Sequence, residues 1–351
     1  MWLLLHASFA VLSPVGPRAL GTLQVSELGF GTLNLALDKE ADDPGSAQAL
    51  KAVVAAGGNF VDTAEAYGFG RSERLTAWSA RQAGVNIGCG TGELHVATKF
   101  APVPWRQSAD DVVDACRASA ERLGVEQIPL YQIHFPDIIQ PFKAFGLEQR
   151  KDEVYWEGLA KCYELGLAAN VGVCNYGPTM TQRCYDFLKA RGIELSSNQI
   201  NFSLMYRKDS MATVDKCNEL GVPVIGYFPL ANGLLAGRYD EDNLPPFPKS
   251  LTMKKYVVGD GSDAFPTGGY TPLREVMRSI AESREKSVAA VAINWVICKG
   301  VIPIPGARNG EMAAANMASM GWRLTDDEVA ELESASDAVG FEFSSGGFQL
   351  E

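Results

Sequence analysis

Four residues whose side chains could together deliver a proton stand at or near the ends of short apolar segments. Asp62, Lys99 and His134 each close such a segment, and Tyr67 follows Asp62 by five positions. A tyrosine hydroxyl titrates at about pH 10, so it is a weak acid at neutral pH. A lysine about 4 Å away, at an effective dielectric of about 20, would contribute about 4 kcal/mol. We therefore expect Lys99 to lower the pKa of Tyr67 by up to about three pH units, before desolvation offsets part of that effect.

The other two residues complete a consistent set. A lysine at the end of an apolar strand stays charged only if it is paired, and Asp62 is the natural partner for Lys99. His134 could donate a hydrogen bond to a substrate oxygen. Such a set suits protonation of a carbonyl group that is being reduced, and the hydride must come from a cofactor because no side chain supplies one. Each residue alone has an ordinary structural explanation, so the combination carries the prediction.

Strand-like segments alternate with amphipathic helical segments along most of the chain. The predicted strands are 28–32, 59–62, 95–99, 130–134, 169–174, 197–201, 222–227 and 301–304, and the predicted helices include 109–124, 154–166, 209–221 and 287–299. Alternation implies right-handed βαβ units and a parallel sheet, and eight units in about 300 residues fit one closed (β/α)8 TIM barrel. A doubly wound sheet would also alternate, but its usual Gly-x-Gly-x-x-Gly motif does not occur in the sequence.

The domain organisation predicted from the sequence is simple. Residues 19–351 form one barrel domain, and residues 1–18 form an N-terminal extension. The extension contains a short apolar core and small residues suited to signal cleavage, but no basic residue precedes Arg18, so a cleaved targeting segment and a plain extension both remain open. The stretch 240–270, rich in Pro and Gly, is predicted as a long loop after the seventh strand, at the catalytic mouth of the barrel.

Composition argues against several other classes of function. The net charge of −11 is unlike the basic surface that nucleic-acid binding needs. No apolar run reaches the roughly 18 residues that span a bilayer. The seven Cys are scattered without a CxxC pair and only three His occur, so we expect neither a disulfide framework nor a metal centre. The expected partner is a small carbonyl compound, and the oligomeric state is open.

The short sequence motifs around the four residues resemble those of the aldo-keto reductase superfamily. They are DTAEAYG, ATKF and YQIHFPD, and they are joined by LGFGT at 28–32, VGVCNY at 171–176, SNQINFSLMYR at 197–207, GYFPLANGLLAGRY at 226–239 and IPIPGARN at 302–309. The resemblance runs from about residue 21 to about residue 336 and is strongest to plant and algal plastid-type members. It implies a (β/α)8 barrel that binds NADP(H) and reduces an aldehyde or ketone to an alcohol. It also favours a plastid location, with the cytoplasm as the alternative.

The resemblance implies a role for each matching residue. Tyr67 would be the general acid, Lys99 and Asp62 would tune it, and His134 would orient the substrate. The implied cofactor-binding residues are Thr32, Asp62, Asn175, Gln199, Tyr227, Pro229, Leu230, Gly233, Gly306, Arg308 and Asn316. Within this set, Asn175 and Gln199 would hold the nicotinamide carboxamide, and Tyr227 would stack on the ring. The candidate substrate-pocket residues are Leu33, Trp105 and Phe135.

Several residues depart from the pattern of the superfamily. Cys174 stands where serine is usual, so one hydrogen bond to the carboxamide is expected to be weaker, and Phe228 replaces the usual serine of the seventh-strand motif. Met312 and Ala315 replace polar residues and weaken the expected preference for NADP(H), whereas the Arg308 guanidinium favours a 2′-phosphate. Leu33 replaces an aromatic residue, so we expect a wider substrate pocket or one rebuilt by the long loop.

Two other functions are compatible with the same fold. The first is a non-catalytic NADP(H)-binding subunit or redox sensor, although such a protein would not need all four residues of the proton-transfer set. The second is an aldolase in which Lys99 forms a Schiff base. That reaction needs a neutral lysine, and an adjacent Asp62 would keep Lys99 charged instead.

Overall fold

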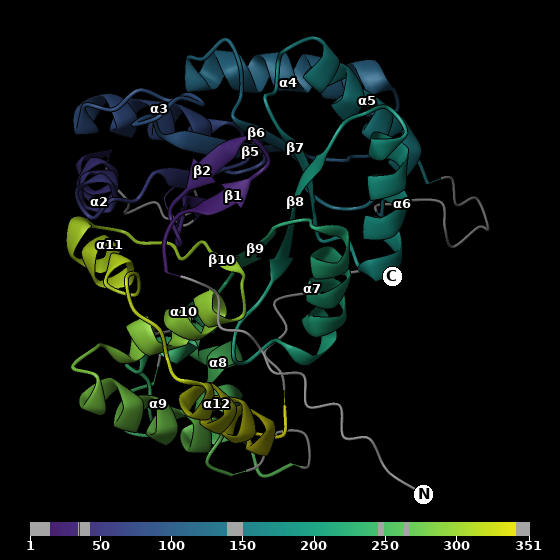
Figure 1. Cartoon of the computed structure of the whole chain (residues 1–351). Helices are drawn as coiled ribbons and strands as arrows, with labels where there is room; N and C mark the ends of the chain where they lie inside the picture. Colours follow the sequence, from purple (N-terminus) through teal and green to yellow (C-terminus); the bar gives the residue numbers. More distant parts are fainter. Residues whose placement is uncertain are drawn as a thin grey trace, which may run out of the picture.

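The computed structural model describes residues 15–33, 35, 43–138, 150–244, 249–262 and 267–341. Within these ranges, eight parallel strands are ordered β10-β9-β8-β7-β6-β5-β4-β3 (Figure 1). The strands are β3 (Phe30–Gly31), β4 (Phe60–Asp62), β5 (His95–Phe100), β6 (Leu130–Ile133), β7 (Val171–Cys174), β8 (Leu195–Asn201), β9 (Val224–Tyr227) and β10 (Ile302–Pro303). Each lies within, or largely overlaps, a strand predicted from the sequence.

The two outer strands of this sheet meet and close it. Gly31 and Gly306 form a parallel bridge. The Gly29 N–H donates to the Pro303 carbonyl at 2.9 Å, and the Gly31 N–H donates to the Pro305 carbonyl at 3.1 Å. A side chain at Gly31 would place its Cβ 2.7 Å from the Ile304 carbonyl oxygen, so this close approach requires glycine. The predicted (β/α)8 barrel is thereby confirmed.

Helices surround the sheet in the alternating order that the sequence predicts. They are α2 (Asp43–Ala55), α3 (Arg71–Ala83), α4 (Ala109–Leu123), α5 (Asp152–Glu164), α6 (Pro178–Lys189), α7 (Lys208–Leu220), α8 (Lys249–Val258), α9 (Thr271–Ser283), α10 (Val288–Cys298), α11 (Gly310–Met317) and α12 (Asp326–Ala338). Helix α4 begins at a capping box in which Ser108 and Asp111 bond each other's backbone, and it ends at Gly124 with φ 72°. None of the helices in the described ranges combines the length and apolar character needed to cross a bilayer.

The long loop predicted over 240–270 is only partly correct, because the structure places α8 inside it. The prolines and several of the glycines that indicated a loop lie on either side of α8 and not within it. Residues 245–248 and 263–266 of the predicted loop lie outside the described residues.

An antiparallel hairpin of β1 (Arg18–Leu20) and β2 (Leu23–Val25) precedes the barrel and was not predicted. Its buried side chains pack against residues from the start of the barrel strands, including Phe60. It therefore closes the amino-terminal end of the barrel (purple in Figure 1). Arg18, the last residue of the predicted extension, lies in β1, whereas residues 1–14 lie outside the described residues.

The buried carboxylate of Glu27 connects several segments at this end of the barrel. Glu27 pairs with the Arg323 guanidinium, and the two side chains are 6% and 10% exposed. Glu27 also accepts hydrogen bonds from the N–H groups of Gly16 at 2.8 Å and Gly321 at 3.0 Å. Burial opposes ionisation of Glu27, but Arg323 and the two N–H groups outweigh it and lower the pKa of Glu27.

Glu27→Gln is therefore expected to destabilise the fold by about 3 kcal/mol at pH 7, because Arg323 is left buried without its counter-charge. Since folding lowers the pKa of Glu27, the unfolded chain binds the proton more readily. The contribution of Glu27 is then fully present above its unfolded pKa and is lost as pH falls through the lower folded pKa. Urea unfolding of both proteins from pH 7 down to about pH 3 checks this. A stability difference that does not shrink on acidification would contradict the assignment.

Candidate active site

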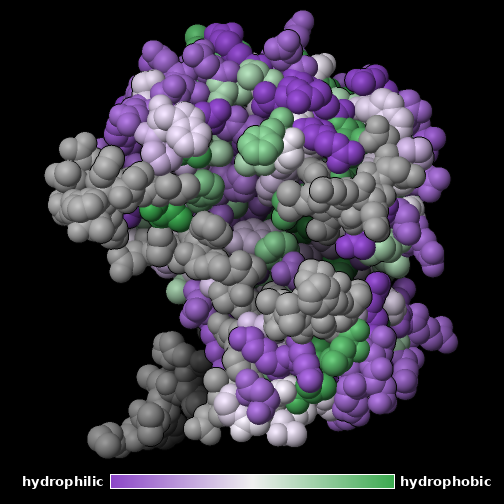
Figure 2. Space-filling model, turned by 180° about the vertical axis from the view of Figure 1, so that it is seen from behind, coloured by the Kyte–Doolittle hydropathy of each residue, from purple (hydrophilic) through white to green (hydrophobic). Residues whose placement is uncertain are grey.

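The candidate catalytic residues lie at the carboxyl ends of three neighbouring strands. Asp62 ends β4, Lys99 is the penultimate residue of β5, and His134 directly follows β6. Because these strands pair in parallel, their ends meet at one mouth of the barrel, opposite the β1–β2 hairpin. The face opposite the hairpin is hollowed near its centre (Figure 2). Tyr67 lies in the loop after β4.

Lys99 is held by partners for all three of its N–H bonds. Its Nζ lies 2.5 Å from Asp62 Oδ1 and 2.9 Å from the Thr63 carbonyl oxygen, and both charged side chains are almost fully buried. The third contact is the Tyr67 hydroxyl at 3.5 Å. Burial alone would lower the pKa of Lys99, but Asp62 outweighs burial and raises it. Lys99 is therefore cationic, which argues against a Schiff-base mechanism.

The pKa of Tyr67 departs from its ordinary value in the direction opposite to the sequence-based expectation. Burial raises it to about 12, although Lys99 pulls it down. The prediction of a lowered pKa was wrong because the desolvation cost of the phenolate exceeds the attraction of Lys99, much of which Asp62 neutralises. Tyr67 is therefore fully protonated at neutral pH. It has a proton to donate, and a nearby cation faces the charge that forms when the proton leaves.

His134 stands beside Tyr67 as a neutral imidazole. The two rings meet edge to face, with centroids 5.5 Å apart and an interplanar angle of 74°. Burial, assisted by the charge of Lys99, lowers the pKa of His134 to about 3. Its Nδ1 atom is buried and has no hydrogen-bond partner among the described residues. A neutral imidazole can hydrogen-bond a ligand without bringing charge to the site.

Two amide side chains flank these residues. Gln199 Nε2 donates to Asp62 Oδ2 at 2.7 Å. Asn175 Nδ2 donates to the His134 carbonyl at 2.9 Å, and Asn175 Oδ1 accepts from the Tyr227 hydroxyl at 2.7 Å. Asn175 has a left-handed backbone with φ 65°, a conformation that is uncommon and clusters at functional sites. Cys174 Sγ lies 3.2 Å from Asn175 Nδ2, so a thiol occupies the position where the family pattern has serine.

The segment after β9 has an unusual backbone. Phe228, Ala231 and Asn232 all have positive φ, and Gly233 has φ 92°. Such a run costs free energy in isolation and persists only where the surrounding structure holds it. Pro229 and Leu230 lie within the same turn, so this segment brings together three of the predicted cofactor-binding residues, Pro229, Leu230 and Gly233.

The remaining predicted cofactor residues lie on both sides of the seam between β3 and β10. Thr32 Oγ1 donates to the Asp62 carbonyl at 2.9 Å and is buried. Asn316 Nδ2 donates to the Gly306 carbonyl at 3.3 Å. Arg308, which lies between Gly306 and Asn316 in the sequence, is exposed. The structure thus groups Thr32, Gly306 and Asn316 around the seam, next to the proton-transfer residues.

The three predicted substrate residues differ in their surroundings. Phe135 packs beside His134, with ring centroids 5.5 Å apart. Leu33 follows β3 and is half-buried. Trp105 is 78% exposed, so among the described residues no enclosed pocket forms around it. Two residues that the sequence analysis missed, Glu65 and Arg106, form an ion pair at the edge of the site. The position of Glu65 between Asp62 and Tyr67 was the available signal.

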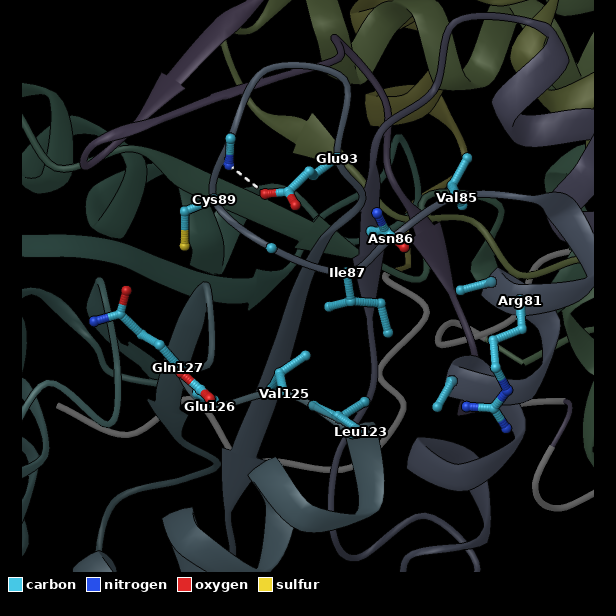
Figure 3. A pocket seen from close by; sticks show the side chains of 15 residues that line it. Arg81, Val85, Asn86, Ile87, Cys89, Glu93, Leu123, Val125, Glu126 and Gln127 are labelled. Atoms are coloured by element: carbon cyan, nitrogen blue, oxygen red, sulfur yellow. Dashed lines mark hydrogen bonds between the residues drawn. The ribbon is translucent and has the colours of Figure 1, made fainter.

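A cavity of about 680 Å³ lies elsewhere, between the ends of α3 and α4 and the turn that precedes β5 (Figure 3). Cys89 and Glu93 lie on one side of this cavity and Arg81 on another. None of the four candidate catalytic residues lines it, and burial together with Glu93 raises the pKa of the Cys89 thiol. The candidate catalytic residues therefore lie apart from this cavity.

The chain is similar to known proteins over most of its length. Residues 27–337 match the model of the Aldo/keto reductase family. A chloroplastic pyridoxal reductase of Arabidopsis thaliana is 37% identical over 328 residues, which cover 90% of this chain and 85% of that protein. An uncharacterized oxidoreductase of Mycobacterium tuberculosis is 32% identical over 327 residues and covers 91% of each chain.

Solved structures are similar over nearly the whole fold. The glycerol dehydrogenase AKR11B4 of Gluconobacter oxydans superposes with a TM-score of 0.74 at 23% identity, covering 96% of this chain and 99% of that one. A Bombyx mori aldo-keto reductase in complex with NADP superposes with a TM-score of 0.67 at 25% identity, covering 95% and 98%.

Proposed function

The chain belongs to the aldo/keto reductase family and is an NADP(H)-dependent oxidoreductase, and we propose that it reduces a small aldehyde to an alcohol with Tyr67 as the general acid. The observation that carries the proposal is the contact of the Tyr67 hydroxyl with Lys99 of the buried Asp62–Lys99 pair at the mouth of the barrel. A protonated phenol beside a fixed cation is suited to donating a proton, and a lysine held cationic is not suited to covalent catalysis.

The proposed substrate class is an aromatic aldehyde of the pyridoxal type. The relative that is 37% identical is named as a pyridoxal reductase, and the match covers most of both chains. Phe135, beside His134, offers an aromatic surface on which a planar substrate could pack. A ketone or a non-aromatic aldehyde is the alternative that a substrate panel must separate.

The proton path follows from the chain's own residues. The Tyr67 hydroxyl gives its proton to the carbonyl oxygen of the substrate, and the charge left on the phenolate faces Lys99. Asp62 holds Lys99 in place and keeps it cationic. His134, neutral at physiological pH, donates a hydrogen bond that orients the same carbonyl oxygen. Solvent then returns the proton to Tyr67.

The residues around these four fit a nicotinamide dinucleotide. Asn175 and Gln199 place two amides next to Asp62 and His134, and an amide pair suits the carboxamide of nicotinamide. Tyr227 would stack on one face of the nicotinamide ring. The turn with positive φ after β9 would lie beside the pyrophosphate, and Arg308 would bind the 2′-phosphate. When bound, NADPH supplies the hydride that no side chain can provide.

Purified protein should oxidise NADPH when pyridoxal is added, and it should do so faster than with an aliphatic aldehyde of similar size. The measurement is the loss of NADPH absorbance with each of several aldehydes and ketones, repeated with NADH. Binding of NADPH without turnover of any carbonyl compound would contradict the proposed activity. Faster turnover of the aliphatic aldehydes would be consistent with the proposed reductase activity but would contradict the aromatic substrate class.

The rate of reduction should be insensitive to pH from about pH 5 to about pH 9. The pKa of His134 is lowered to about 3 and that of Tyr67 is raised to about 12, so both keep one protonation state across this interval. A profile of kcat against pH checks this. A step at about pH 6.5, the ordinary range of histidine, would show that His134 titrates during turnover.

We also propose a plastid location, supported by the chloroplastic relative alone. A fluorescent fusion of the full chain, expressed in plant cells, tests it. Fluorescence confined to the cytosol would contradict this location and would leave the proposed activity untouched.

A further inference from the structure

The carboxylate of Glu65 lies in the same loop as the proposed general acid and holds that loop to its neighbour. Glu65 Oε1 accepts the Ala101 N–H at 2.8 Å and also pairs with Arg106 Nη1. Arg106 Nη2 donates to Glu65 Oε2 at 3.2 Å. Both oxygens are thus engaged by one guanidinium, the geometry in which an ion pair fixes orientation as well as distance. The two side chains are 10% and 26% exposed, so water screens them only in part.

Arg106 is itself anchored by contacts other than the one with Glu65. Its guanidinium lies over the Phe100 ring, 4.9 Å from the centroid, and its carbonyl oxygen accepts the Tyr155 hydroxyl of α5 at 2.9 Å. Phe100 directly follows Lys99 at the end of β5. The pair therefore connects the loop after β4, the end of β5 and helix α5.

The ring of Tyr67 packs against His134 and lies beside Lys99, but few polar contacts fix its hydroxyl group. Among the described residues the Tyr67 hydroxyl has one hydrogen bond, to Lys99 at 3.5 Å, which is long for a strong contact. The three residues after Tyr67 all have positive φ, and one of them is the non-glycine residue Phe69 at 53°, whose backbone is therefore strained. The Phe69 side chain is 94% exposed. The Gly70 N–H donates to the Glu65 carbonyl at 2.8 Å and closes this strained turn onto Glu65.

We propose that Glu65 and Arg106 are positioning residues that hold the Tyr67 hydroxyl within reach of both Lys99 and the substrate. This inference rests on the proposed function, in which Tyr67 is the general acid. Neither residue needs to touch the substrate, because both act through the loop. Proton transfer depends steeply on geometry, and a misplacement of about 1 Å can reduce a rate by about 100-fold.

The first test is Glu65→Gln, which keeps the size of the side chain and removes its charge. We expect kcat for aldehyde reduction to fall by about 10- to 100-fold, with the Kd for NADPH changed by less than about threefold. Arg106→Met should give a similar loss, and the double variant should lose little more than either single one because the two residues act as one unit. Arg106→Lys, which keeps the charge without the two parallel hydrogen bonds, should lie between Arg106→Met and the wild type.

Glu27→Gln is the matched control, since it makes the same change in the buried ion pair at the opposite end of the barrel. It should lower stability and leave kcat unchanged. If Glu65→Gln and Glu27→Gln alter kcat equally in folded protein, or if Glu65→Gln stays within about twofold of the wild type, the positioning role is overturned.

Hydrogen exchange gives a readout that does not depend on activity. Backbone N–H groups of residues 64–70 should exchange faster in Glu65→Gln and Arg106→Met than in the wild type or in Glu27→Gln. Unchanged exchange in this segment would overturn the inference. If the wild-type protein reduces no carbonyl compound but the variants still exchange faster in this segment, the coupling of the loops is supported and the proposed function is wrong.

Discussion

Tyr67→Phe is expected to lower kcat for aldehyde reduction by about 10³-fold or more while leaving the Kd for NADPH unchanged. The substitution removes one oxygen atom and its proton and keeps the ring that packs against His134. Because the pKa of Tyr67 is raised to about 12, the wild-type residue is protonated at every pH at which the enzyme is assayed. The loss should therefore be the same at pH 6 and pH 8. Single-turnover kinetics with saturating NADPH measure it.

Tyr163→Phe supplies the matched control for this experiment. Tyr163 lies on α5, is 41% exposed and is not among the residues that form the site, so the same chemical change there should leave kcat unchanged. If Tyr67→Phe retains more than about a tenth of wild-type turnover, another group delivers the proton and the assignment of Tyr67 fails. If NADPH binding is lost together with turnover, the variant has disturbed the site more widely than the mechanism requires.

The alternation of strands and helices predicted a parallel α/β fold, and the missing Gly-x-Gly-x-x-Gly motif together with the family resemblance favoured the barrel. The barrel in turn brings Asp62, Lys99 and His134 together. The reason is geometric, since every parallel strand in such a sheet ends at the same mouth. Residue types at strand ends therefore predict which side chains meet, even when they are separated by tens of residues. The Lys99–Asp62 contact of 2.5 Å is the direct expression of this rule.

Features that depend on long-range burial could not be predicted in the same way. The pKa of Tyr67 is set by how completely the fold removes the hydroxyl from water, and no local pattern reports that. The ion pair of Glu65 with Arg106 joins two loops across 41 positions of sequence. Both are products of tertiary packing, and both decide how the proposed acid behaves.

The β1–β2 hairpin and α8 were missed for different physical reasons. The hairpin occupies a short segment next to the N-terminal extension, and its apolar alternation over 18–25 is too brief to separate from that extension. Helix α8 is short, and the sequence on both sides of it is rich in proline and glycine. This flanking composition is a stronger signal for a loop than ten residues are for a helix, so the whole stretch was predicted as a loop. In each case the neighbouring segment dominated the local signal.

Lys99→Met is expected to lower stability by about 3–5 kcal/mol and kcat by more than about 100-fold. The variant leaves the Asp62 carboxylate buried at the end of β4 without its cation, while Gln199 still donates to the other carboxylate oxygen. Much of the loss of stability is therefore the cost of an uncompensated charge. Urea unfolding measures the stability, and single-turnover kinetics with saturating NADPH measure the activity.

The double variant Asp62→Asn with Lys99→Met separates these two effects. It removes both charges, so most of the stability should return, whereas catalysis should not, because no cation then faces the phenolate of Tyr67. Lys161→Met, in an exposed pair with Asp110, is the control and should change stability little, because water screens that pair. Recovery of turnover in the double variant would show that Lys99 serves the fold alone. Recovery of stability without turnover would mean that this chain maintains a costly buried pair for the chemistry of Tyr67.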